Sequence, residues 1–120
     1  MPKDFERTRR VSEQLQRELA MLIQTELTDP RIGMVTVSAV ETSRDLKHAK
    51  VFVTALDQGQ SHNDVIAALQ HAAGFLQHEI GVRLRMRTIP KLRFIYDESI
   101  ERGTNLSALI DTAIQDDQQK

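Results

Sequence analysis

The chain has 120 residues, of which 40% are apolar and 28% are charged, and these are the proportions of a single globular domain. It contains no cysteine, which excludes disulfides, thiolate metal sites and cysteine nucleophiles and favours a reducing compartment such as the cytosol. The longest unbroken apolar run, 19–23, is far shorter than the ~20 residues of a membrane span, so we expect no membrane segment.

The charges are unevenly distributed along the chain, although the formal net charge is only −1. The segment 83–93 contains five cations and no acid. From residue 94 to the C-terminus, six acids accompany two cations. The near-neutral total therefore conceals a basic run that suits an anionic partner.

The first half of the chain predicts a helix and a β-hairpin. Apolar residues at three- and four-residue spacing predict an amphipathic helix over 4–27, and Pro30 ends it because its ring disfavours helical geometry at the preceding residue. Alternating runs predict strands over 33–41 and 48–56, joined by the polar turn 42–45. We expect the two strands to pair antiparallel.

Alternation gives each predicted strand two different faces. In the first strand the buried face holds Val35, Val37 and Ala39. In the second strand the face opposite the apolar one holds Lys50, Phe52 and Thr54.

The four phenylalanines stand mostly at core-like positions, and the chain has one tyrosine and no tryptophan. Any binding of nucleic acid would therefore rest on backbone charge more than on base stacking.

The second half predicts two helices separated by a bend, followed by a strand. Ser61 is placed to cap a helix, and Gly74 interrupts the buried stripe of that helix, which we interpret as a bend before a third helix. The end of the third helix near Arg85 stays open between a helical and an extended segment. A strand over 90–96 follows, and a short helix over 106–114 precedes an acidic tail. This order predicts an α+β fold with the helices on one face of a three-stranded sheet.

No pattern for catalysis or metal binding is convincing. The five glycines form no phosphate-binding loop. Asp64, His71 and His78 recur every seven residues, which is ~10.5 Å along a helix, whereas zinc ligands lie ~2 Å from one ion. Only a sharp bend at Gly74 would bring them together. Ser99 and its acidic neighbours resemble no nucleophile elbow, so we expect no enzyme, no metal and no cofactor.

The basic run is the feature that points to function. If it is extended, Arg83, Arg85 and Arg87 lie on one side and present guanidinium groups suited to bidentate phosphate contacts. If it is helical, the first and last of them still share a face. The alternative is a solvated edge whose arginines discourage strand addition or pair with the acidic C-terminal third. Weaker candidates for phosphate binding lie on the first predicted helix: Lys3, Arg7 and Arg10.

Three ordered blocks of sequence carry a resemblance to a known family. They are RVSEQLQREL at 10–19, TDPRIGMVTVS at 28–38 followed by DLKHAKVFV at 45–53, and RLRMRTIPKLRFIYDES at 83–99. Together the blocks resemble the ribosome-binding factor A family, over about residues 5–102. The family fold is a KH-like domain of the bacterial type (type II), in which an Ala-x-Gly kink replaces the Gly-x-x-Gly loop of other KH domains. The kink is matched by three residues: Ala72, Ala73 and Gly74.

The resemblance implies a KH-like ribosome-binding domain over 1–103 and a short C-terminal helix with an acidic tail over 104–120. It implies a non-enzymatic, monomeric, cytoplasmic assembly factor that binds the small ribosomal subunit and its ribosomal RNA. Such a factor would support late maturation and RNA processing, and growth in the cold. The alternative is a protein-interaction adaptor that uses the apolar side of the C-terminal helix at Leu106, Leu109 and Ile110.

Overall fold

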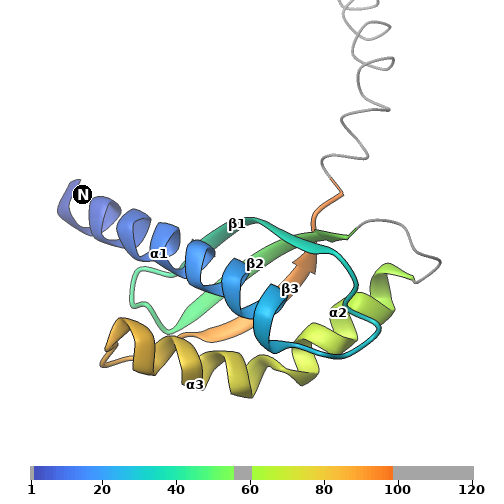
Figure 1. The fold of residues 1–120 in the computed structure, drawn as a ribbon. Helices are drawn as coiled ribbons and strands as arrows, with labels where there is room; N and C mark the ends of the chain where they lie inside the picture. Colours follow the sequence, from blue (N-terminus) through green and yellow to red (C-terminus); the bar gives the residue numbers. More distant parts are fainter. Residues whose placement is uncertain (1, 56–60, 99–120) are drawn as a thin grey trace, which may run out of the picture.

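The computed structural model describes residues 2–55 and 61–98, with the backbone alone for 2–5. These residues form an α+β fold in the predicted order (Figure 1). The elements are α1 (Pro2–Glu26), β1 (Val35–Thr42), β2 (His48–Ala55), α2 (His62–His71), α3 (Ala73–Leu84) and β3 (Lys91–Tyr96). None of the described helices carries an apolar stretch long enough to span a bilayer. The predicted helix over 106–114 lies outside the described residues.

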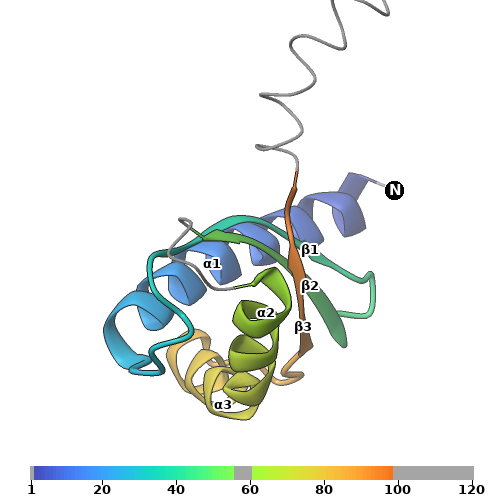
Figure 2. The same cartoon turned by 90° about the vertical axis from the view of Figure 1, so that its right-hand side faces the viewer.

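The three strands form one mixed sheet in the order β1-β2-β3. β1 and β2 pair antiparallel, as the hairpin predicts, whereas β2 and β3 are parallel because the chain crosses over through α2 and α3 between them. Figure 2 shows α2 and α3 together on one side of the strands. The core lies between the sheet and the helices, and its fully buried larger side chains include Leu15, Leu19, Leu22, Val51, Val53, Leu69, Leu76 and Ile80.

The buried face of β1 differs from the predicted one in its second half. The register shifts between Val37 and Ala39, which places Ser38 in a β-bulge. An extra residue in one strand moves the following side chains to the other face. The prediction that Ala39 shares the buried face is therefore wrong, and Val40 is buried instead. The Gln16 amide of α1 donates to both carbonyls at the bulge, at 3.4 Å and 3.3 Å.

The break between the second and third helices falls at Ala72. Ser61 caps α2 by accepting a hydrogen bond from the Asp64 N–H at 3.1 Å, as predicted. Ala72 then has φ −86° and ψ 0°, and α3 starts at the next residue. Gly74 lies inside the first turn of α3, and a Cβ added there would meet nothing within 4 Å. The bend therefore precedes Gly74, and the space around this glycine would admit a methyl group.

The outer edge of β3 is covered by two glutamine side chains. Gln70 of α2 donates its amide Nε2 to the Leu92 carbonyl at 3.0 Å and accepts the Phe94 N–H at 3.2 Å through Oε1. Gln77 of α3 accepts the Leu92 N–H at 3.3 Å. These are the backbone groups that point away from β2, so side chains occupy bonding positions that a further strand would use.

The third helix ends at Leu84, which resolves the alternative left open by the sequence. Arg85 has a left-handed backbone with φ 51°, and its N–H bonds to the Gly81 carbonyl as a helix cap. The residues from Arg85 to Pro90 then form a loop that leads into β3. The three arginines predicted to bind phosphate therefore share neither a strand nor a helix, and each has its own surroundings: Arg83, Arg85 and Arg87.

Candidate nucleic-acid interface

Three separate segments meet at one end of the molecule, on the left in Figure 1. They are the first half of α1, the β1–β2 turn and the loop between α3 and β3. Between them lies a cavity of about 410 Å³, whose cationic lining comes from Arg7, Arg85 and Arg87. We call it the arginine cavity. The fold brings together guanidinium groups that are almost eighty positions apart in the sequence.

Two residues with left-handed backbones border the arginine cavity. Leu46 in the β1–β2 turn has φ 60°, and Arg85 has φ 51°. This conformation costs a residue with a side chain ~1–2 kcal/mol, and it persists only where the surrounding structure imposes it. At Arg85 it stops the helix and turns the chain, so that Arg85 and Arg87 both line the cavity instead of following α3.

Asp45 is the single acid in the lining of the cavity. Its Oδ1 accepts hydrogen bonds from the Ser43 hydroxyl at 2.6 Å and from the Lys47 N–H at 3.0 Å. The Ser43 bond first, and then the Lys47 N–H, lower the pKa of the Asp45 carboxyl. The carboxylate thus serves to hold the turn.

The cavity arginines are available to an outside anion. Within the part of the chain that the structure describes, Arg7, Arg85 and Arg87 take part in no ion pair. All three are exposed to solvent. A cluster of uncompensated guanidinium groups around a concave surface is suited to phosphate, which each group can bind through two parallel hydrogen bonds.

Arg83 lies elsewhere, in the last turn of α3. Its Nε is 3.7 Å from the Glu79 carboxylate, and its Nη1 is 3.9 Å from Oε2 of Glu18 in α1. That Glu18 oxygen is buried and accepts no hydrogen bond, so the nearby cation offsets its charge. A phosphate would have to compete with two carboxylates for Arg83, which makes it the weakest of the three predicted arginines.

The three cations predicted on α1 also lie in different places. Arg7 lines the arginine cavity, whereas Arg10 is exposed on α1 outside the cavity lining. Lys3 belongs to α1, but its side chain lies outside the described part of the structure. The sequence interpretation missed Lys47, whose carbonyl accepts the Lys91 N–H at 2.8 Å and so ties the β1–β2 turn to the start of β3. A hydrogen bond between main-chain groups of two distant segments has no signal in the residue types.

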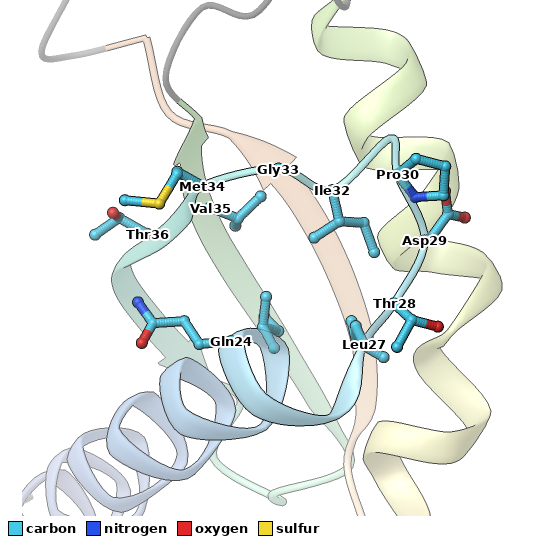
Figure 3. A pocket seen from close by; sticks show the side chains of 11 residues that line it. Gln24, Leu27, Thr28, Asp29, Pro30, Ile32, Gly33, Met34, Val35 and Thr36 are labelled. Carbon is cyan, nitrogen blue, oxygen red and sulfur yellow. The ribbon is translucent and has the colours of Figure 1, made fainter.

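The opposite end of the molecule contains a larger pocket of different character (Figure 3). It has a volume of about 500 Å³ and lies between the end of α1 and the loop that leads to β1. Figure 3 shows Leu27, Ile32, Met34 and Val35 among its apolar side chains. Next to it, Asp29 pairs with Arg31 at 2.8 Å, and the Arg31 hydrogen bonds lower the pKa of Asp29 from 3.8 to about 2.

No group of three or more His, Asp or Glu side chains in residues 2–55 and 61–98 is placed to hold a metal ion. Asp64 and His71 belong to α2, whereas His78 belongs to α3 beyond the break at Ala72.

Comparison with known proteins assigns the chain to a family. The family model described as ribosome-binding factor A matches residues 7–110. The chain belongs to the ribosome-binding factor A family. Two curated relatives with that name illustrate the similarity. The protein of Thioalkalivibrio sulfidiphilus is 57% identical over 117 residues, which is 98% of this chain and 91% of the relative. The protein of Alkalilimnicola ehrlichii is 56% identical over 121 residues, which is 100% of this chain and 93% of the relative.

Solved structures of ribosome-binding factor A have the same fold. The crystal structure of the Thermus thermophilus factor superimposes with a TM-score of 0.68 at 35% identity, over 74% of this chain and 93% of that one. A homology model of the Thermus thermophilus factor, fitted into a cryo-EM map of its complex with 30S, superimposes with a TM-score of 0.60 at 34% identity. It covers 72% of this chain and 91% of that one. The KH-like fold implied by the three sequence blocks is thereby confirmed.

Proposed function

We propose that this member of the ribosome-binding factor A family is a non-enzymatic assembly factor that binds the small ribosomal subunit during late maturation. The proposal includes support for ribosomal RNA processing and for growth in the cold, and action as a monomer in the cytoplasm, where ribosomes assemble. The name of its relatives supports a ribosomal partner, and the 30S complex of the Thermus thermophilus factor supports the small subunit.

The single observation that carries the proposal at the level of residues is the arginine cavity. Its three guanidinium groups come from α1 and from the loop after α3, and they gather at one end of a chain whose net charge is close to zero. Placing like charges together opposes folding, and a polyanion such as ribosomal RNA relieves this repulsion when it binds. We therefore assign phosphate contacts to Arg7, Arg85 and Arg87.

Co-sedimentation with purified ribosomal particles tests the partner. We expect the protein to travel with free small subunits and to be absent from large subunits and joined ribosomes. Equal recovery with all particles would point to nonspecific attraction to RNA and would contradict the proposal.

The salt dependence of binding tests the residues. Each phosphate contact that is lost lowers the slope of log affinity against log salt by about 0.7 to 0.9. We expect that decrease for Arg85→Gln and for Arg87→Gln. Arg83→Gln is the matched comparison, because it removes the same charge two positions away from a side chain already paired with Glu18 and Glu79. Unchanged slopes in the Arg85 and Arg87 variants would reject the assignment.

The adaptor alternative rests on Leu106, Leu109 and Ile110, which lie outside the described residues. Its mark would be binding that is insensitive to salt and is lost in a Leu106→Ser/Ile110→Ser variant. The RNA proposal predicts the opposite on both counts.

A further inference from the structure

The helices cover one face of the sheet and leave the other face without a helical layer among the described elements (Figure 2). We call it the open sheet face. In β2 and β3 its side chains alternate with the buried ones, and the strand pairing shows which of them are neighbours. The open sheet face carries His48, Lys50, Phe52 and Thr54 of β2 and Lys91, Arg93 and Ile95 of β3.

Two cations stand directly opposite one another on this face, because Lys50 is in register with Arg93. A third cation, Lys91, is in register with His48. Neighbouring strands lie only about 4.8 Å apart, and like charges directly opposite destabilise a sheet. Glu41 of β1 is in register with Lys50 on its other side. Even so, Lys50, Lys91 and Arg93 form no ion pair among the described residues. No described carboxylate therefore forms an ion pair with these three cations, although Glu41 stands next to Lys50 in the sheet.

An aromatic side chain lies beside these cations. Phe52 is in register with Ile95 on one side and with Ala39 on the other, and it is partly exposed. Its neighbour in sequence, Val51, points into the core, as does Phe94. Phe52 thus lies on the face that alternation predicts for it, opposite the apolar face of β2. A flat apolar surface next to unpaired cations matches the alternation of bases and phosphates in a single strand of RNA.

The cationic part of the open sheet face adjoins the arginine cavity. β2 starts two residues after Leu46, and β3 starts three residues after Thr88, and both of these residues line the cavity. The Lys91 N–H bond to the Lys47 carbonyl fixes the two strand starts beside each other. A strand of RNA held at the arginine cavity can therefore continue onto the sheet. The acids beside this path are Asp45 in the cavity lining and Glu41, which is in register with Lys50.

We propose that the open sheet face binds a single-stranded segment of RNA, with phosphates on Lys50, Lys91 and Arg93 and a base stacked on Phe52. This inference rests on the proposed function and extends its contact surface from the arginine cavity across the sheet. RNA fits better than an apolar protein partner, because the cations would have to be desolvated without compensation beneath an apolar surface.

The test uses the full chain with a fluorescein-labelled oligouridylate of about a dozen nucleotides, long enough for one such domain, and with purified small subunits. We expect Lys50→Gln and Arg93→Gln each to lower the salt slope for the oligonucleotide by about 0.7, the value for one phosphate contact on a single strand. The matched control is Arg17→Gln, an exposed cation of α1 away from both surfaces, and its slope should equal that of the unmodified chain.

Stacking is tested separately with Phe52→Leu, which keeps an apolar side chain and removes the aromatic ring. We expect oligouridylate binding to weaken at least about fivefold, the lower end of the effect of losing one stacked base. Phe75→Leu is the control, because Phe75 is 43% exposed on α3, among the helices on the other side of the sheet. Equal losses in both phenylalanine variants would overturn the assignment of the base to Phe52.

Thermal unfolding distinguishes loss of a site from loss of the fold. Arg93→Gln relieves the repulsion with Lys50, so this variant should unfold at the same temperature as the unmodified chain or higher. Lys50→Gln relieves the same repulsion but also loses the attraction of Glu41, so its unfolding temperature should stay about the same. Weaker RNA binding by an equally stable protein supports the proposal.

If these variants bind as the unmodified chain does while Arg85→Gln and Arg87→Gln bind weakly, the open sheet face is not an RNA site and the proposed function stands. If neither set weakens binding, the RNA contacts assigned to both surfaces are rejected, whereas the proposed function is rejected by equal recovery with all ribosomal particles in co-sedimentation.

A different occupant would also overturn the proposal. The acidic residues Asp111, Asp116 and Asp117 of the same chain are the competing anions. Zero-length carbodiimide cross-links from these aspartates to Lys50 or Lys91 in the full chain, together with unchanged oligouridylate binding by the sheet variants, would assign the face to them.

Discussion

The two ends of this molecule use charge in opposite ways. At the end shown in Figure 3, Arg31 donates to Asp29 through its backbone N–H, Nε and Nη2, and the pair fixes the loop above an apolar pocket. At the other end, Arg7, Arg85 and Arg87 line a cavity without an ion pair among the described residues. Paired charges thus organise the loop at one end, whereas the unpaired guanidinium groups at the other end are the ones for which we propose phosphate contacts.

The largest effect is expected at the loop end, from Ile32→Ala. Ile32 is 3% exposed and joins the loop to the core. Removing a buried isoleucine side chain costs about 2–5 kcal/mol, and the adjacent pocket leaves no side chain ready to fill the space. Urea denaturation should show this loss, whereas the salt slope of RNA binding stays unchanged. A change in that slope would contradict the separation of the two ends.

The next largest effect is expected at the arginine cavity, where Arg85→Gly should raise the stability of the fold and weaken RNA binding. Glycine adopts the left-handed conformation without the cost that a side chain pays, so we expect a gain of roughly 1 kcal/mol in the free energy of unfolding. The same change should lower the salt slope of RNA binding by about 0.7 to 0.9. Arg85→Gln is the control, which should lower the slope equally and leave stability unchanged. A less stable glycine variant would show that Arg85 is not strained.

A smaller effect on stability is expected from replacing a glycine by alanine at each of two positions in α3. Gly74→Ala introduces a methyl group into open space and should raise the free energy of unfolding by about 0.5–1 kcal/mol. At Gly81 a Cβ would lie 2.5 Å from Cδ1 of Ile89, so this side chain must move. We expect Gly81→Ala to gain less or to lose stability in thermal unfolding. An equal gain at both positions would show that Ile89 moves without cost.

The smallest effect is expected in the dependence of stability on pH, through Asp29. The pKa of Asp29 falls from 3.8 to about 2 in the folded chain, chiefly through the Arg31 hydrogen bonds. A lowered folded pKa stabilises the fold above pH 3.8, and this contribution disappears as the pH falls towards 2. We therefore expect Asp29→Asn to lower the thermal midpoint at about pH 6 and to differ less from the unmodified chain at about pH 2. A difference independent of pH would exclude the ionised Asp29 as its cause.

The order of the elements was predictable because each depends on local periodicity. The stripe of Leu15, Leu19 and Leu22 and the cap at Ser61 are properties of neighbouring residues, and the structure confirms them. The bulge at Ser38 was not predictable, because it depends on how β1 pairs with β2. Strand order was not predictable either, since the parallel pairing of β3 follows from the path of the intervening helices.

The candidate site was visible only in part. The basic run named Arg85 and Arg87, yet nothing in their neighbourhood indicates that Arg7 joins them or that Arg83 instead approaches Glu18. Both relations join segments that are distant in the sequence, so only the folded chain shows them. The cations of β2 and β3 face one another only once the register is known, so the repulsion between Lys50 and Arg93 has no signature in the sequence.

The glutamines along the outer edge of β3 affect whether a strand of another chain can pair with the sheet. A sheet edge with free backbone N–H and carbonyl groups can pair with a strand of another chain. Gln70 and Gln77 bond the Leu92 N–H, the Leu92 carbonyl and the Phe94 N–H with neutral side-chain amides, which cannot be extended into a further strand. Strand pairing between two copies along this edge would first have to displace these three hydrogen bonds.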